Sequence, residues 1–234
     1  MGILWHLFVE ILDVSPIILP APSAVLKTFA NKFGLLMDHA LFTLTNVIEG
    51  FLLSVVLAFA LGAAIAYSWI LKVTLYPLMV IIRSLPIIAI APFLVIWIGY
   101  GSPSILAVSL LLSFFPIVIA TISGLTKVDP DMVRLMRSLK ASEWLILRKL
   151  RFKNALPYLF DGYKVAITLS IVGVIVGEFI ASVKGLGYII VTANYQLDIP
   201  LSMSSLLVLT ILSLSLFGVV LLFEKLVIPW HVSG

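Results

Sequence analysis

Cysteine is absent from the 234-residue chain, histidine occurs three times, and only 11% of the residues are charged. Without cysteine, the chain has no disulfide, no thiolate metal ligand and no cysteine nucleophile. The histidines, His6, His39 and His231, are too far apart to cluster on one helix. We therefore expect neither a metal site nor redox chemistry, and no cofactor bound by this chain.

The scarcity of charge also bears on the solvent around the protein. Soluble globular domains carry about 25% charged residues, whereas here 62% of the residues are hydrophobic and the mean hydropathy is +1.22. A core of this length in water needs a charged coat that these residues do not supply. The net charge of +4 does not indicate nucleic-acid binding, because the basic residues lie between apolar segments. We predict an all-α, polytopic membrane helical bundle.

Apolar runs define the expected spans. A helix needs roughly 20 apolar residues to cross about 30 Å of hydrocarbon. Five strong segments meet this length: Leu41 to Trp69, Val73 to Ile98, Pro103 to Leu125, Tyr158 to Val183 and Leu201 to Phe223. Polar residues interrupt the stretch 3–19, which predicts a short or partial N-terminal span. After it, residues 24–33 have helical periodicity and predict either a surface amphipathic helix or an ordinary connector.

The basic residues give the orientation. Of the 15 Lys and Arg residues, nine lie between Lys127 and Lys164, where only four acids accompany them. The positive-inside rule places this region in the cytoplasm. The turn at 99–102 and the segment 184–200 are then external. We expect residues 1–234 to form a single transmembrane domain that contains a cytoplasmic loop at 127–157.

The cytoplasmic loop is patterned like two short helices. Asp129 and Pro130 are a helix start, and Ser142 followed by Glu143 is a second one. A basic cluster at 148–153 is expected to close the second helix, with Pro157 near the first turn of the next span.

We expect this hairpin to bind a cytoplasmic partner through its apolar and basic residues. The expected contacts are Arg134, Arg137, Lys140, Ser142, Glu143, Trp144 and Leu147. Trp144 is expected to matter most, because buried aromatic residues dominate such interfaces. The alternative is an interfacial loop that only holds Lys and Arg near lipid headgroups.

Three ionisable residues fall inside the spans: Glu49, Arg83 and Glu178. Charges in hydrocarbon are costly and mark functional candidates. They could form a translocation path that contacts the solute, or Arg83 and Glu178 could form a structural ion pair. Their formal charges sum to minus one, which favours a neutral or heteroaromatic solute over a multiply charged anion.

Small residues recur every four positions from Gly50 to Ala66, namely Gly50, Ser54, Ala58, Gly62 and Ala66. Such a face allows a neighbouring helix to approach closely. The neighbour could belong to the same chain or to a second copy.

Several motifs occur in a specific order: Leu19-Pro20-Ala21-Pro22-Ser23, Arg83-Ser84-Leu85-Pro86, Trp97-Ile98-Gly99, Phe115-Pro116, Ala155-Leu156-Pro157, Gly177-Glu178 and Gly185-Leu186-Gly187-Tyr188. With this order the chain resembles the permease subunits of binding-protein-dependent ATP-binding-cassette importers. It is most similar to the branch that carries nitrate, sulfonates, taurine and thiamine-precursor pyrimidines.

This resemblance implies a type I importer permease in the cytoplasmic, or inner, membrane. It implies that two copies of the permease form a homodimer, which binds two ATPase subunits that hold ATP and Mg²⁺. It also implies an extracytoplasmic solute-binding protein, and no catalytic residue in this chain.

The loop departs from the family's pattern at four positions. Permeases of this type usually carry Glu-Ala-Ala and then a Gly four residues after the last Ala, whereas this chain has Arg134-Leu135-Met136 and then Lys140. A missing Gly removes easy access to left-handed backbone at the bend. Arginine in place of glutamate inverts the charge offered to the partner, which predicts a dedicated, charge-complementary ATPase.

A second function from another class fits the same composition. The chain could be a self-contained secondary carrier or channel that uses Glu49, Arg83 and Glu178 for ion coupling. A docking hairpin favours the importer, because a carrier has no need of one. An intramembrane enzyme is not expected, since no nucleophile or paired acid is present in a suitable pattern.

Overall fold

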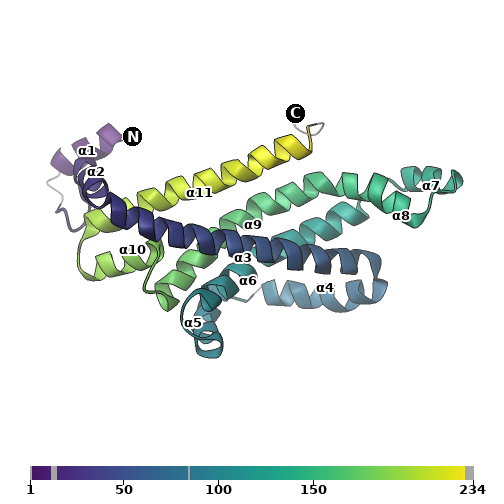
Figure 1. Ribbon diagram of the computed structural model, residues 1–234, viewed down its shortest axis with the longest axis horizontal. Helices are drawn as coiled ribbons and strands as arrows, with labels where there is room; N and C mark the ends of the chain where they lie inside the picture. Colours follow the sequence, from purple (N-terminus) through teal and green to yellow (C-terminus); the bar gives the residue numbers. More distant parts are fainter. Residues whose placement is uncertain (1, 12–14, 84, 230–234) are drawn as a thin grey trace.

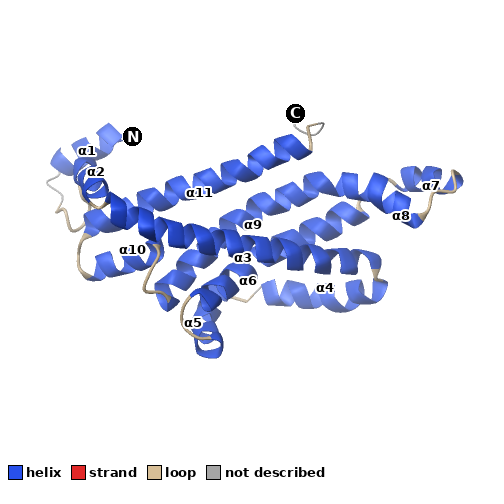
Figure 2. Ribbon diagram, in the orientation of Figure 1, coloured by secondary structure: helices blue, strands red, loops and turns tan. Residues whose placement is uncertain are grey.

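The computed structural model describes residues 2–11, 15–83 and 85–229, and within these ranges every regular element is a helix (Figures 1 and 2). In chain order these are α1 (Gly2–Ile11), α2 (Pro22–Asn31), α3 (Phe33–Tyr67), α4 (Trp69–Arg83), α5 (Ile87–Ile98), α6 (Ser102–Thr126), α7 (Pro130–Ser138), α8 (Glu143–Ile146), the π-helical turn η1 (Leu147–Arg151), α9 (Phe152–Ala181), α10 (Leu186–Tyr195) and α11 (Ile199–Val227). The predicted all-α class is confirmed.

Four helical segments are long and apolar enough to cross a membrane: α3, α6, the continuous helix Glu143–Ala181 and α11. The stretch Val73 to Ile98, which was expected to be one span, is instead divided into α4 and α5. Pro86 explains the division, because a proline disfavours helical backbone in the residue before it and has no N–H to donate. Pro86 is accordingly the N-cap of α5.

The small residues of α3 face α6 within the same chain. Ser54 Oγ lies 2.6 Å from Ser113 Oγ. A Cβ added at Gly62 would lie 2.7 Å from Thr121 Cβ, so only glycine allows this approach. The predicted packing face is therefore confirmed, and its partner is an intramolecular helix.

α6 and α9 form the centre of the bundle and also pack through small residues. A Cβ added at Gly173 would lie 2.6 Å from Ser109 Cα. Ser109 and Ser170 share a hydrogen bond of 2.8 Å, and Ser170 donates to the Val47 carbonyl at 3.1 Å. Because these hydroxyls are buried and satisfied, they join α3, α6 and α9 without leaving polar groups exposed to lipid.

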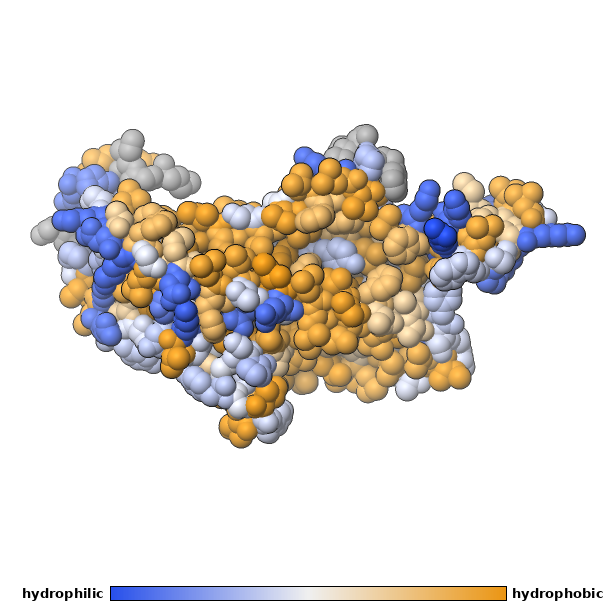
Figure 3. All heavy atoms as spheres, in the orientation of Figure 1, coloured by the Kyte–Doolittle hydropathy of each residue, from blue (hydrophilic) through white to orange (hydrophobic). Residues whose placement is uncertain are grey.

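The two ends of the molecule differ in their elements. α1, α2 and α10 gather at one end, and α7 and α8 protrude at the other (Figure 1). The surface between them is a broad apolar band with hydrophilic residues towards both ends (Figure 3). Residues 127–157 thus lie at the opposite end from α1, α2 and α10, and their placement in the cytoplasm stays a prediction.

The N-terminal helices lie at the end opposite α7 and α8 (Figure 1). α1 has 10 residues and at 1.5 Å per residue is about 15 Å long, which is too short to cross about 30 Å of hydrocarbon. α2 packs against α11, where Ser204 Oγ donates to the Val25 carbonyl at 2.9 Å. Lys32 and Asp198 add an ion pair of 3.0 Å between the same parts of the chain. Of the two alternatives for residues 24–33, the structure has a helix, which runs from Pro22 to Asn31, while Phe33 already begins α3.

Candidate functional site

Both predicted helix starts in the loop 127–157 are confirmed. The Asp129 carboxylate accepts from the Asp131 N–H at 2.8 Å at the start of α7. The Ser142 hydroxyl accepts from the Leu145 N–H at 3.3 Å at the start of α8. Each side chain satisfies an N–H that the first turn of a helix leaves free.

The bend after α7 is left-handed at Lys140, which has φ +58°. The Ala141 N–H donates to the Met136 carbonyl at 3.0 Å, and the Lys140 N–H donates to the Arg137 carbonyl at 2.9 Å. These two bonds form a complete Schellman motif. The expected loss of the left-handed bend therefore does not occur, because lysine adopts the conformation that glycine takes more easily.

An ion pair closes the hairpin between α7 and α8. Arg137 Nη2 lies 2.9 Å from Glu143 Oε1, and both side chains are more than half exposed. Arg134 pairs with Asp131 one turn earlier in α7, at 3.0 Å. In water such pairs contribute little stability, so they mainly orient the charged groups.

α7 presents an apolar stripe that nothing in the described chain covers. Met132, Leu135 and Leu139 are 51%, 56% and 73% exposed. Met132 and Leu135 lie on α7 and Leu139 is its C-cap, and together they form a surface suited to a groove on another protein.

The second half of the loop corrects one expectation. The helix that starts at α8 does not end at the basic cluster but continues through η1 into α9. Pro157 lies inside α9 rather than at its start. The backbone stays helical at Arg151 and Phe152, since a π-helical turn absorbs one extra residue without ending the helix. Trp144 and Leu147 of this elbow line a cavity against α3.

Two polar side chains fasten the elbow to the end of α6. Arg151 Nη1 donates to the Leu125 carbonyl at 3.2 Å. Asn154 Nδ2 donates to the carbonyls of Gly124 and Lys127, at 3.0 and 2.9 Å. The last carbonyls of α6, which have no partner within the helix, are thereby satisfied.

At the end of the bundle opposite the α7–α8 hairpin, the buried carboxylate of Glu178 holds a turn. Its two oxygens accept from the Thr43 hydroxyl and the Gly187 N–H, each at 2.8 Å. Thr43 Oγ1 also accepts from the Leu186 N–H at 2.9 Å. Glu178 is 1% exposed, and these bonds connect α3, α9 and the start of α10.

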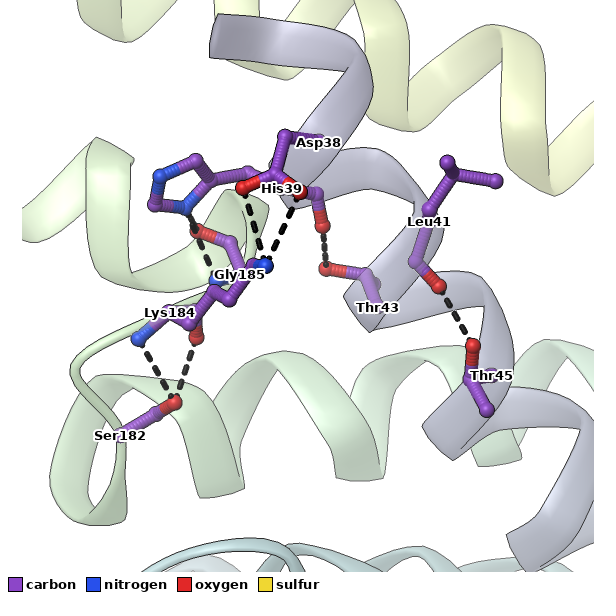
Figure 4. Close-up of polar contacts among 8 residues, drawn as sticks. All are labelled: Asp38, His39, Leu41, Thr43, Thr45, Ser182, Lys184 and Gly185. Carbon is purple, nitrogen blue, oxygen red and sulfur yellow. Dashed lines mark hydrogen bonds and ion pairs between the residues drawn. The ribbon is translucent and has the colours of Figure 1, made fainter.

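His39 binds the same turn from α3. Its Nδ1 lies 3.0 Å from the Gly185 nitrogen and 3.1 Å from the Gly185 oxygen. Asp38 forms an ion pair of 2.9 Å with Lys184 beside it (Figure 4). Gly185 has φ +111°, and a Cβ there would collide with the Glu178 carboxylate. The turn therefore requires glycine.

The two intramembrane carboxylates, Glu49 and Glu178, do not share one site. Glu49 lies on the exposed side of α3, whereas Glu178 is buried. The side chain of Arg83 is outside the described residues, so the ion pair between Arg83 and Glu178 stays a prediction. The bonds that Glu178 makes are to a hydroxyl and a backbone amide.

A different charged cluster joins α9 to α11. Lys164 Nζ lies 2.7 Å from Asp161 and 3.2 Å from Glu224, whose side chain is 11% exposed. From sequence, Lys164 served only as one limit of the basic region that gave the orientation. The i, i+3 spacing of Asp161 and Lys164 is the local signal that could have revealed part of this cluster.

A cavity of about 460 Å³ lies along α6 and α9. Its walls are mostly apolar and include Phe115 and Tyr158, and its polar residues include Lys127 and Asp161. Lys127 Nζ also lies 5.9 Å from the centre of the Tyr158 ring. Cavities with apolar and aromatic walls and a few polar groups are typical of small-molecule sites.

Comparison with known proteins agrees with this architecture. Residues 50–230 match the family described as binding-protein-dependent transport system inner membrane component. A probable ABC transporter permease protein of Haemophilus influenzae is 31% identical over 92% of this chain and 87% of the relative. The riboflavin transport system permease protein of Chloroflexus aurantiacus is 32% identical over 99% and 87% of the two chains. The formylaminopyrimidine transport permease protein of Halalkalibacterium halodurans is 29% identical over 98% and 92%. The chain belongs to the family of binding-protein-dependent inner membrane components, the permease subunits of ATP-binding-cassette importers.

Proposed function

We propose that this permease carries a small heteroaromatic nutrient, such as a pyrimidine vitamin precursor or a flavin, across the cytoplasmic membrane. Two relatives are named for riboflavin and formylaminopyrimidine transport, and both compounds contain nitrogen heteroaromatic rings. Nitrate, sulfonate and taurine are the competing solutes, and all of them carry an anionic group.

The cavity along α6 and α9 is the observation that carries this choice. Its charged residues are one cation and one acid, Lys127 and Asp161. A path selective for anions is expected to concentrate Lys and Arg, whereas aromatic walls such as Phe115 and Tyr158 suit a flat ring. The formal charges of Glu49, Arg83 and Glu178, which sum to minus one, also favour a neutral or heteroaromatic solute over a multiply charged anion.

The energy comes from ATP hydrolysis in a separate subunit that binds the cytoplasmic hairpin. The stripe of Met132, Leu135 and Leu139 enters a groove of that ATPase, and the cations Arg134, Arg137 and Lys140 meet acidic residues at its rim. Ser142, Glu143, Trp144 and Leu147 border this surface. A second copy of the permease completes the path, and an extracytoplasmic binding protein delivers the solute.

Transport in vesicles tests the solute and the energy source together. The permease is co-reconstituted with the ATPase and binding protein encoded beside it, and uptake of riboflavin, formylaminopyrimidine and taurine is compared. We expect saturable, ATP-dependent uptake of one heteroaromatic solute and none of taurine. Uptake of taurine alone would contradict the solute assignment, and uptake driven by an ion gradient without ATP would favour a secondary carrier.

Site-directed cross-linking tests the docking surface. A cysteine at Leu135, which is exposed at the cytoplasmic end, should form a cross-link with the ATPase subunit. A cysteine at Tyr195, which is 85% exposed at the opposite end, is the matched control and should form none. Equal capture at both positions, or capture at neither, would contradict the assigned surface.

A further inference from the structure

A second cavity, of about 580 Å³, lies at the cytoplasmic end of α3, between that helix and the elbow formed by α8, η1 and the start of α9. Its lining is almost entirely apolar and includes Phe59, Ala64, Tyr67, Trp144 and Arg148. The cavity along α6 and α9 shares no lining residue with it.

The cavity reaches from the membrane surface into the hydrocarbon. Tyr67 is the last residue of α3, and Phe59 lies two turns earlier, about 12 Å deeper at 1.5 Å per residue. Trp144 is 69% exposed, and aromatic residues of this kind are typical of the interface between lipid and water. An elongated apolar molecule fits this position better than a globular partner.

Cations surround the shallow end of the cavity. Arg148 belongs to the lining, and Lys149 beside it is also exposed. The Arg151 guanidinium lies 5.8 Å from the centre of the Tyr67 ring, which places a third cation at the same level. Hydrophilic residues gather where the loop leaves the apolar band (Figure 3). The occupant therefore combines an apolar chain with an anionic head.

We propose that this cavity binds an anionic glycerophospholipid of the cytoplasmic leaflet, with an acyl chain between α3 and the elbow and the phosphate at Arg148. Basic residues at the cytoplasmic face attract anionic lipids, and guanidinium groups suit phosphate oxygens. The bound lipid fills the space between α3 and the elbow, so it supports the base of the docking hairpin. This site is independent of the solute that the permease carries.

Quenching of Trp144 fluorescence tests the site directly. In the full-length chain, the other four tryptophans are replaced by phenylalanine, and the protein is placed in phosphatidylcholine vesicles with a fixed fraction of phosphatidylglycerol. Either the anionic or the neutral lipid carries brominated acyl chains. We expect brominated phosphatidylglycerol to quench Trp144 several-fold more than brominated phosphatidylcholine at the same mole fraction.

Two variants and one control distinguish the contribution of the lipid headgroup from that of the acyl chain. R148Q should reduce the preference for the anionic lipid roughly five-fold, equivalent to about 1 kcal/mol for one interfacial cation. A64L fills the cavity from the exposed side of α3 and should reduce quenching while Arg148 remains. R134Q, on α7 away from the cavity, should change neither result.

Three results would overturn the proposal. The first is equal quenching by the two brominated lipids, which would mean that bulk lipid alone contacts Trp144. The second is a preference for the anionic lipid that R148Q leaves intact. The third is quenching that A64L leaves unchanged, since the acyl chain would then lie outside the cavity.

Discussion

Replacing Glu178 by glutamine or by leucine separates two roles that a buried carboxylate can have in a membrane span, ion pairing and hydrogen bonding. Glu178 accepts from the Thr43 hydroxyl and from the Gly187 N–H. In E178Q the amide oxygen can still accept from Gly187, while the amide NH₂ donates to Thr43. The Thr43 hydroxyl can then donate to the His39 carbonyl, which lies 3.2 Å away. We therefore expect E178Q to keep the external turn.

Leucine removes both acceptors. Thr43 retains the His39 carbonyl as a partner, but the Gly187 N–H is left buried without an acceptor. An unsatisfied buried group of this kind costs about 1–3 kcal/mol, which corresponds to roughly a 5-fold to 150-fold shift in the opening equilibrium of the turn. T43V should act in the same direction, because it removes the acceptor of the Leu186 N–H.

Hydrogen exchange of a peptide that covers residues 183–190 measures this opening, since local unfolding exposes backbone amides to solvent. The amides of this peptide should exchange close to the wild-type rate in E178Q. In E178L and T43V they should exchange faster, by roughly 5-fold to 150-fold. If E178Q opens as much as E178L, the charge itself is required. A cation must then face Glu178, as the predicted pair with Arg83 would have it, and the hydrogen-bond explanation is refuted.

Three further predictions concern the hairpin and the core. K140G should slow amide exchange in the hairpin roughly five-fold, because about 1–2 kcal/mol of left-handed strain outweighs the entropy cost of glycine; K140A, which keeps the strain, should not. G173A should lower the thermal unfolding midpoint, because its Cβ would meet the α6 backbone, whereas G218A has nothing within 4 Å and should not. R137E should loosen the hairpin in exchange experiments by at most about 1 kcal/mol, and E143R added to it should restore the wild-type rate.

Local signals in the sequence predict the parts of the site that depend on neighbouring residues. The helix starts at Asp129 and Ser142 need only a capping side chain and an amide two or three positions later, and both were found where expected. The small-residue face of α3 was also readable, because its four-residue period needs no knowledge of the partner.

Other features depend on groups that are distant in the sequence. Glu178 meets Thr43, which is 135 positions away, and no local pattern identifies this partner. The division between α4 and α5 was missed for another reason. Pro77, Pro86 and Pro92 look alike in an apolar run, yet Pro77 and Pro92 lie inside helices and only Pro86 begins one. The conformation of Lys140 was missed because lysine rarely adopts positive φ.

One helical segment connects the two ends of the permease. Residues Glu143–Ala181 form a continuous helix of 39 residues, with the α7–α8 hairpin at one end and the Glu178 carboxylate near the other. Its irregular features, the π-helical turn at 147–151 and Pro157, both lie at the cytoplasmic end, and these are the places where helices bend. Movement of the hairpin is thus expected to be absorbed at the elbow or passed through the straight part of α9. The bonds that fasten the elbow, from Arg151 and Asn154 to the end of α6, decide between these outcomes, because they make α6 and α9 move together.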